Sequence, residues 1–276
     1  MRQVGVKLVA LDVDGTIVPG GQKRQEYPSA RIRSAVAELK AAGIVVVLAS
    51  GRMFPGTAKV ARHLGLETPL ICQQGCSVHL PDGTITHEFP INHEAAIEVI
   101  SYAKAIDRPY EWFNPLRYIV SRKTAQTEEY GRVSGITPQY HPAPETTGLR
   151  PTGVGILSTH EEANGIHRAL VSHHGDALHV LDFPTVTVAV APDANKGHAL
   201  SLLCDDLGID RHETVAIGDS VNDAPMLAWA GRGYAMPRSD RYALDAADEV
   251  LEDEEEPVAA LLSRIARRPR STVVAR

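Results

Sequence analysis

Two aspartates, Asp12 and Asp14, stand two residues apart directly after the apolar run Leu8–Leu11. On an extended chain such side chains point the same way, so their carboxylates repel each other. Each alone would more often form a turn or a helix cap. Similar polar groups follow other apolar runs: Ser50 and Arg52 in "LASGR", Lys196 in "NKG", and Asp219 and Asp223 in "GDSVND".

The chemistry of these groups is complementary. Asp12, Asp14, Asp219 and Asp223 would form a cluster of repelling carboxylates, which needs a cation, and oxygen ligands of this kind suit Mg²⁺. The hydroxyl of "LASGR" and the amine of "NKG" suit a phosphate group instead. A metal, a phosphate clamp and a carboxylate nucleophile together predict phosphoryl transfer through an aspartyl-phosphate.

The apolar runs that precede these polar groups predict that the groups lie together at one edge of a sheet. Short apolar runs that read as buried strands alternate with segments that read as amphipathic helices. This alternation predicts an α/β fold with a doubly wound, Rossmann-like parallel sheet. Ligands bind at the carboxyl ends of the strands in such sheets, where the polar groups fall. The runs are "VKLVALD", "IVVVLAS", "PLICQ", "TVAIGD" and "RGYAM".

The middle of the chain has a different pattern. "CSVHLPDGTITHEF" predicts a hairpin, and the following segment to about Asp182 mixes helices with short strands. The opening alternation then resumes, which predicts an inserted α+β domain. We expect residues 1–82 and 185–276 to form the catalytic core, and residues 83–184 to form the insertion, with boundaries uncertain by several residues.

Four motifs together resemble a known family. "DVDGT", "LASGR", "NKG" and "GDSVNDAPML" follow the order of the motifs of the haloacid dehalogenase-like hydrolases. The chain is most similar to the Cof-like phosphatases, in which an α/β cap lies between the second and third motifs. The resemblance covers Val6–Cys76 and Val186–Met236, whereas the middle block resembles the family's cap in position and size.

The resemblance implies a role for each acidic residue. Asp12 would be the nucleophile, and Asp14 would protonate the leaving oxygen and then activate water. Mg²⁺ would be held by the Asp12 carboxylate, the Asp14 backbone carbonyl and Asp219, with Asp223 bound directly or through water. Gly15 would let the backbone pass close to the site.

The resemblance also implies a phosphate-binding set. Ser50 and Lys196 would hold the transferring phosphoryl oxygens, and Asn222 would add a contact. Arg52 has two open roles, contact with the substrate or a tie between core and cap. Thr16 would fix the loop after the first motif.

The chain departs from the family pattern at two places near these motifs. Gln74-Gly75-Cys76 stands where Cof-like proteins often have Asn-Gly-Ala, and Met236-Pro237-Arg238 stands where they commonly have Met-Gly-Asn. No catalytic group is lost. The departures indicate a diverged subgroup, and the effects of Gln74 and Pro237 are left open.

Composition limits the partners. The net charge is −6, which argues against nucleic acid, and no apolar run is long enough to span a membrane. Three cysteines are too few for a disulfide framework, and the twelve histidines lack the spacing of a zinc enzyme. We therefore expect a cytoplasmic location. The resemblance implies a phosphatase that acts on a small phosphorylated metabolite, a sugar phosphate or a phosphorylated cofactor. The sequence makes no prediction of oligomeric state.

Two alternatives remain open from the sequence. A phosphotransferase or mutase could use the same core if it shielded the phosphoryl-enzyme from water. A phospho-signalling or phosphate-binding module could use a similar set of groups without catalysis. Against the signalling module stand the chain length, the cap-sized insertion and the order of the acidic residues; against a binding module stands the presence of Asp12, Asp14 and Lys196.

Overall fold

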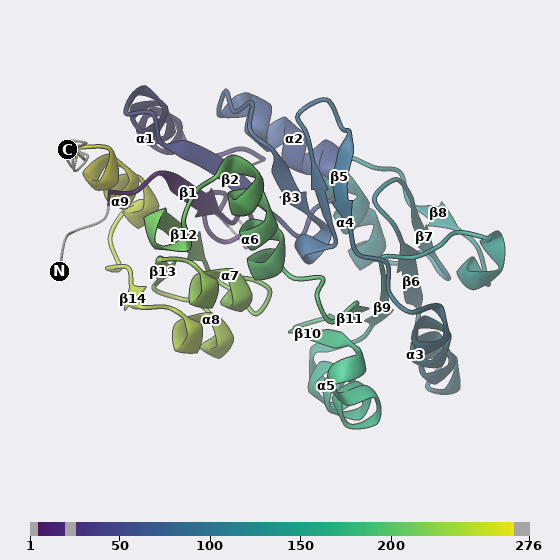
Figure 1. The fold of residues 1–276 in the computed structure, drawn as a ribbon. Coiled ribbons are helices and arrows are strands. Elements are labelled where there is room, and N and C mark those ends of the chain that lie inside the picture. Colours follow the sequence, from purple (N-terminus) through teal and green to yellow (C-terminus); the bar gives the residue numbers. More distant parts are fainter. Residues whose placement is uncertain (1–4, 20–25, 268–276) are drawn as a thin grey trace. The chain divides into compact units, whose positions relative to one another are not determined.

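The computed structural model describes residues 5–19 and 26–267 (Figure 1). Contacts divide the chain into two compact units. Of the described residues, the first comprises 5–19, 26–50, Ala58–Ile71 and 196–267. The second comprises Gly51–Thr57 and Cys72–Asn195.

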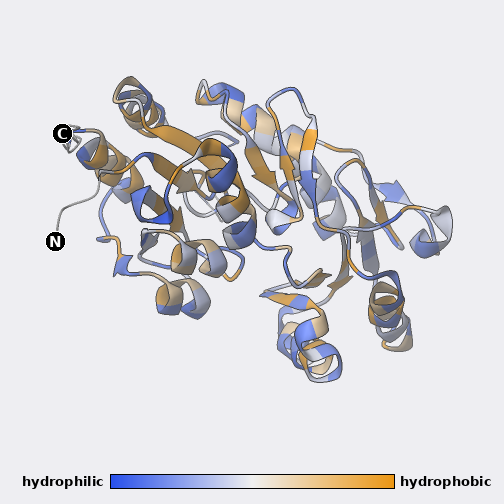
Figure 2. Ribbon diagram, in the orientation of Figure 1, coloured by the Kyte–Doolittle hydropathy of each residue, from blue (hydrophilic) through white to orange (hydrophobic). Residues whose placement is uncertain are grey.

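A parallel sheet forms the centre of the first unit, with strands in the order β14-β13-β12-β1-β2-β3. Figure 2 shows how apolar β1 and β2 are, and every residue of β1 is buried. The predicted α/β fold with a Rossmann-like parallel core is thus confirmed. The strands are β1 (Leu8–Leu11), β2 (Val45–Ala49), β3 (Leu70–Cys72), β12 (Thr214–Gly218), β13 (Arg232–Ala235) and β14 (Glu249–Val250).

Local sequence signals set the ends of the first helix of this unit. The Ser29 side chain accepts a hydrogen bond from Ile32 N, and Gly43 follows the helix at φ +70°. The helices from the first and third parts of the chain are α1 (Ala30–Ala41), α2 (Phe54–His63), α6 (Lys196–Leu207), α7 (Ala224–Trp229), α8 (Arg241–Ala246) and α9 (Pro257–Ala266), with the 3₁₀ turn η4 (Arg211–Glu213).

The second unit contains a mostly antiparallel sheet, in the order β10-β11-β9-β6-β7-β8. It also holds the predicted hairpin, β4 (Ser77–His79) with β5 (Ile85–Glu88). The sheet strands are β6 (Tyr110–Phe113), β7 (Tyr118–Val120), β8 (Gln139–Tyr140), β9 (Gly153–Leu157), β10 (His179–Phe183) and β11 (Val186–Val190); the helices are α3 (His93–Ala105), α4 (Ala125–Ser134) and α5 (His160–His174), with 3₁₀ turns η1 (Gln73–Gly75), η2 (Pro144–Thr147) and η3 (Gly175–Ala177).

Strand β11 lies beyond the expected end of the insertion at residue 184, yet it pairs with β9 and β10 in the second sheet. The compact unit likewise runs on to Asn195. Compactness does not test which residues act as a cap, so the division into 1–82 with 185–276 and 83–184 stays a prediction.

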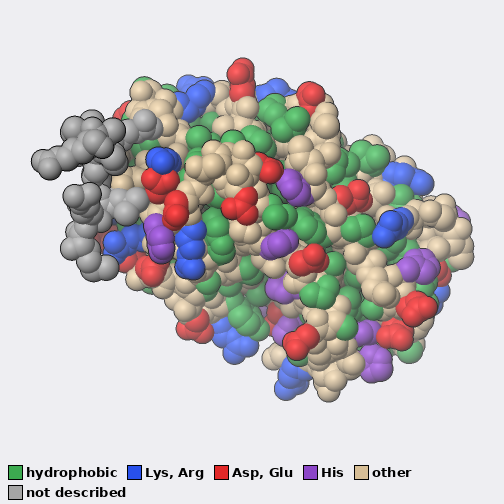
Figure 3. Space-filling view, in the orientation of Figure 1, with side chains coloured by type: hydrophobic (Ala, Val, Ile, Leu, Met, Phe, Trp, Pro, Cys, Tyr) green, Lys and Arg blue, Asp and Glu red, His purple; other side chains and the backbone are tan. Residues whose placement is uncertain are grey.

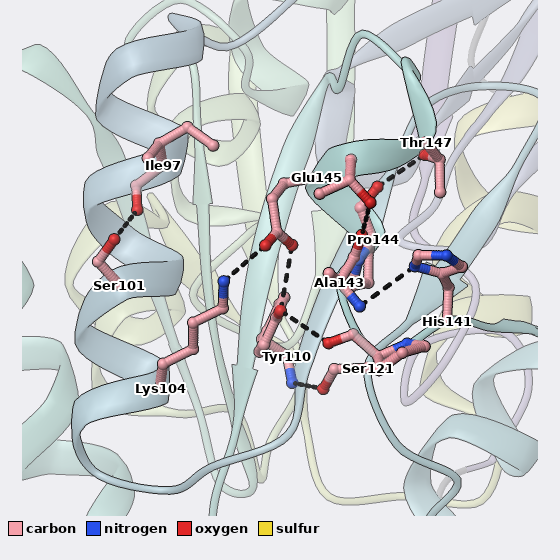
Figure 4. Close-up of polar contacts among 12 residues, drawn as sticks. Ile97, Ser101, Lys104, Tyr110, Ser121, His141, Ala143, Pro144, Glu145 and Thr147 are labelled. Carbon is pink, nitrogen blue, oxygen red and sulfur yellow. Dashed lines mark hydrogen bonds and ion pairs between the residues drawn. The ribbon is translucent and has the colours of Figure 1, made fainter.

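Residues 137–151, a proline-rich segment before β9, are anchored by the carboxylate of Glu145 (Figure 4). Glu145 accepts hydrogen bonds from Lys104 Nζ on α3 at 2.5 Å and from the Tyr110 hydroxyl on β6 at 3.1 Å. Tyr110 OH also contacts the carbonyl of Pro142 at 3.3 Å. These contacts join the segment to α3 and β6.

A second carboxylate of this unit, Glu111 on β6, is buried. It accepts a hydrogen bond from the Tyr118 hydroxyl. Gly155 on β9 pairs with Glu111 and leaves space for its side chain, because a Cβ added at Gly155 would lie 2.4 Å from Glu111 Oε2. Burial raises the pKa of Glu111 from 4.5 to about 7, against the opposing hydrogen bond from Tyr118.

We expect Glu111→Gln to flatten the dependence of stability on pH. Glu111 binds its proton more tightly in the folded protein than in the unfolded chain. Its contribution to the free energy of unfolding is therefore complete below pH 4.5 and is lost as the pH rises through 7. Glutamine keeps the neutral form, so the variant should gain up to about 3 kcal/mol over the wild type between pH 4.5 and 8. Urea unfolding at several pH values measures this, with exposed Glu94→Gln as the control. Parallel profiles for wild type and Glu111→Gln would contradict the assignment.

Within the described residues no helix has the length and apolar character that a membrane crossing requires. On the face seen in Figure 3, acidic and basic side chains are interspersed.

Candidate active site

The first motif continues from β1 into a tight turn. Asp12 N donates to Ile217 O on β12 at 3.0 Å, so this residue extends the strand pairing. Hydrogen bonds from Ile17 N and Val18 N to Val13 O then turn the chain back on itself. The Asp12 side chain is buried and Asp14 is exposed, so the two carboxylates have different surroundings.

Gly15 permits the close approach that the sequence analysis expected. Its φ is +97°, a conformation that side-chain-bearing residues rarely adopt. A Cβ added there would lie 2.3 Å from Asp219 Oδ2. The next residue, Thr16, donates from its hydroxyl to Asp219 Oδ1 at 3.3 Å. The turn after the first motif is therefore fitted directly against the fourth motif.

Lys196 is the first residue of α6, and its side chain is completely buried. Its Nζ donates to Asp12 Oδ1 and to Asp223 Oδ1, both at 2.6 Å. The position of the lysine depends on Gly197, because a Cβ there would lie 2.4 Å from the carbonyl oxygen of Pro225 in α7. Close packing of α6 on α7 thus brings the amine to the two carboxylates.

Asp223 closes the loop after β12. Its Oδ2 accepts hydrogen bonds from the backbone N–H groups of Asp219 at 2.9 Å and Ser220 at 3.1 Å. Gly218 is tightly enclosed as well, since a Cβ there would lie 2.4 Å from Asp223 Cβ. Asp223 therefore orders the loop that carries Asp219 while its other oxygen binds Lys196.

The carboxylates of Asp12, Asp219 and Asp223 form a compact cluster. One oxygen from each lies within 4.8 Å of the others. Burial raises the pKa of Asp12 to about 7, with Asp223 and Asp14 adding to the rise and Lys196 opposing it. Burial, together with Asp12 and Asp223, raises the pKa of Asp219 to about 9. If all three carboxylates were ionised, the Lys196 ammonium would offset only one of the three charges, so the ionised cluster is short of positive charge.

These residues fit a magnesium ion. Asp12 Oδ2 is buried and has no hydrogen-bond partner among residues 5–19 and 26–267, which is costly for a carboxylate oxygen unless a cation or substrate binds it. The donors are all oxygens, as Mg²⁺ prefers. A divalent ion would also supply the missing positive charge.

The remaining predicted residues lie near the ends of the same elements or in the second unit. Ser50 directly follows β2, is fully buried, and donates its N–H to Ile71 O at 2.9 Å. Asn222 is buried in the loop after β12, where its Oδ1 accepts a hydrogen bond from Ser220 Oγ at 2.6 Å. Arg52 is buried and is grouped with the second unit, where its carbonyl accepts from Gln73 N at 3.0 Å.

The two departures from the family pattern occupy constrained places. Gln74 has φ +64°, and an added Cβ at Gly51 would lie 2.5 Å from Gln74 Nε2, so the side chain is close to the backbone of the second motif. Pro237 lines a cavity of about 500 Å³ in the first unit, whose wall also includes Gly15 and Asp219. Nothing in the sequence pattern predicted this cavity, because its lining is drawn from five separated segments.

Comparison with known proteins decides the family. The model of the haloacid dehalogenase-like hydrolases matches residues 9–262. The chain belongs to this family. It is 26% identical to Phosphatase YwpJ of Bacillus subtilis (strain 168), over 94% of this chain and 100% of that protein. It is 30% identical to a Phosphoglycolate phosphatase of Methanopyrus kandleri, over 94% and 96% of the two chains.

The fold of this haloacid dehalogenase-like hydrolase also has solved counterparts. A haloacid dehalogenase-like hydrolase from B. subtilis superposes with a TM-score of 0.80 at 24% identity, covering 93% of this chain and 99% of that one. The predicted family, its Cof-like phosphatase branch and the phosphatase class of the enzyme are thereby confirmed.

Proposed function

We propose that this phosphatase hydrolyses a small phosphorylated metabolite, a sugar phosphate or a phosphorylated cofactor, with Mg²⁺ and through an aspartyl-phosphate. The observation that carries the proposal is the buried Lys196 amine between Asp12 and Asp223, with Asp219 beside them. Buried carboxylates with too little positive charge favour binding of a cation. That cation, together with the Lys196 ammonium, would stabilise negative charge on a reacting phosphoryl group.

Asp12 and Asp14 divide the chemistry in this proposal. Asp12 has one oxygen bound to Lys196, and its other oxygen has no hydrogen-bond partner in the part of the chain that the structure describes. This carboxylate attacks phosphorus, and the bond from phosphorus to the leaving oxygen breaks. Exposed Asp14 gives a proton to that oxygen. Asp14 then takes a proton from water, which attacks the aspartyl-phosphate, releases phosphate and restores the Asp12 carboxylate.

The remaining groups bind the metal and the phosphoryl oxygens. Asp12, the backbone carbonyl of Asp14, Asp219 and Asp223 would hold Mg²⁺. When bound, Mg²⁺ would offset negative charge on the carboxylates and on the phosphoryl group. The phosphoryl oxygens would be bound by Ser50, Lys196 and Asn222, with Arg52 as a further contact.

The substrate is expected to be selected by the predicted cap, residues 83–184. A relative named as a phosphoglycolate phosphatase supports the small-metabolite class, while the departures at Gln74 and Pro237 advise against assigning its substrate here. The proposal includes no nucleic-acid or membrane partner. It places the enzyme in the cytoplasm, supported by the buried thiols of Cys72, Cys76 and Cys204, which form no disulfide within the described residues and fit a reducing compartment.

A screen of some tens of phosphorylated metabolites and p-nitrophenyl phosphate, with Mg²⁺, tests the proposal. We expect phosphate release with at least one class of substrate, loss of that activity on full chelation by EDTA, and its recovery on adding Mg²⁺. Asp205→Asn, an exposed change on α6, should behave as the wild type. Activity that survives full chelation would contradict the magnesium site, and inactivity on every compound would contradict the function.

A further inference from the structure

Two helices of the second unit carry a cluster outside the residues discussed so far. Helices α3 and α5 both pack on one core that includes Val99 and Ile100 from α3 and Ile166 and Leu170 from α5. Figure 1 draws them on the same side of the second sheet. Glu98 of α3 faces His173 and His174, the last two residues of α5.

The distances within this cluster do not fit direct hydrogen bonds. Glu98 Oε2 lies 3.7 Å from His173 Nε2 and 3.6 Å from His174 Nδ1, longer than the usual N–H···O range. A ligand atom from each residue lies within 4.8 Å of the others. Two donors that each lie about 2.0–2.1 Å from a tetrahedral zinc ion are about 3.4 Å apart. The spacing is therefore close to that of groups that share one ion.

We propose that Glu98, His173 and His174 bind a divalent transition-metal ion of the Zn²⁺ class, with water completing its coordination. Imidazole nitrogens with one carboxylate oxygen suit Zn²⁺ and are poor ligands for Mg²⁺. The site is separate from the carboxylates around Lys196 and does not depend on the proposed function.

Burial and helix position both favour this site. The His174 side chain is only 5% exposed, so its ring is held in place, while those of His173 and Glu98 are 70% and 58% exposed and open to an arriving ion. The rings of His173 and His174 meet edge to face, with centroids 4.7 Å apart. Both histidines end a 15-residue helix, where the macrodipole favours a cation.

A bound ion would link the end of α5 to α3. Because both helices already pack on the same core, the ion would add a cross-link to existing packing and would not need to create the fold. Stabilisation of the native chain by Zn²⁺ would then follow from mass action. The function of the site would be structural, unlike the zinc chemistry that the histidine spacing excludes.

The test is Zn²⁺ binding by the full-length protein, measured by equilibrium dialysis in excess Mg²⁺ so that the acidic cluster is occupied. We expect one additional Zn²⁺ per chain and a higher melting temperature in its presence. His173→Ala and Glu98→Gln change exposed side chains, so both should fold, and each should weaken Zn²⁺ binding at least about tenfold. The matched controls are His160→Ala on α5 and Glu94→Gln on α3, both exposed.

Three results would overturn the site. The first is that the protein binds no additional Zn²⁺ in excess Mg²⁺. The second is that wild type, His173→Ala and Glu98→Gln bind Zn²⁺ with equal affinity. The third is that the two control variants lose as much Zn²⁺ affinity as His173→Ala and Glu98→Gln. Circular dichroism of each metal-free variant separates lost folding from a lost ligand. Phosphatase activity with Mg²⁺ should be the same in all four variants, so failure of this proposal is distinguishable from failure of the proposed function.

Discussion

Replacement of Asp12 by asparagine is expected to lower kcat at least about a thousandfold, because the amide cannot form the phosphoryl-enzyme. The change preserves shape, and Lys196 keeps its contact with Asp223. Since burial and neighbouring carboxylates raise the pKa of Asp12, removing its charge should leave the metal-free protein at least as stable as the wild type.

Steady-state kinetics on the best substrate of the screen, with a thermal melt of the same samples, measure both effects. The exposed Asp205→Asn is the control. If the variant kept a tenth of the wild-type kcat, this result would contradict the assignment of Asp12 as the nucleophile. A folded and inactive variant would separate catalysis from stability.

Lys196→Met is expected to lower both stability and activity, because it leaves Asp12 and Asp223 buried without their shared cation. Breaking a buried ion pair from one side costs about 3–5 kcal/mol. The loss should be larger at pH 8 than at pH 5.5, because burial raises the pKa of Asp12 to about 7 and this carboxylate takes up a proton as the pH falls. Activity should fall at least about a hundredfold, as when one electrostatic contact to the reacting group is lost.

Denaturant unfolding at the two pH values and steady-state kinetics measure these effects. Exposed Lys59→Met on α2 is the control, and Lys196→Arg, which keeps the charge, offers a second variant if the methionine variant fails to fold. A loss of stability that is the same at both pH values would argue against charge as the cause.

The sequence indicated the acidic and basic groups of the site because each follows a buried strand or starts a helix. The close approach at Gly197 was not predictable, since it is to Pro225 in another helix, whereas the contact at Gly218 is with Asp223 in the same loop. That Asp12 Oδ2 would lack a hydrogen-bond partner among the described residues was not predictable either, because it depends on how the chain packs. The roles of all these residues stay predictions until the kinetics are measured.

Helices with clear end signals were predicted well, and those without them were not. Asn92 caps α3 through a hydrogen bond from Ala95 N, and this helix lies in the segment that was expected to mix helices with short strands. Helix α4 was not predicted, because its sequence "AQTEEYGRVS" is mostly polar; the Thr124 capping box and Gly135 set its ends. The Glu98, His173 and His174 cluster had no sequence signal, since packing of α3 and α5 brings the residues together.

The pairing of β1 with β12 has a consequence for how the protein is made. Leu8 pairs with Thr214 and Leu11 with Ile217, so the central strands of the first unit meet only when the last third of the chain has been synthesised. The residues of the second unit all precede Lys196. We therefore expect the second unit to fold on the nascent chain before β12 has been synthesised. During that time the edge of β1 that later pairs with β12 stays unpaired.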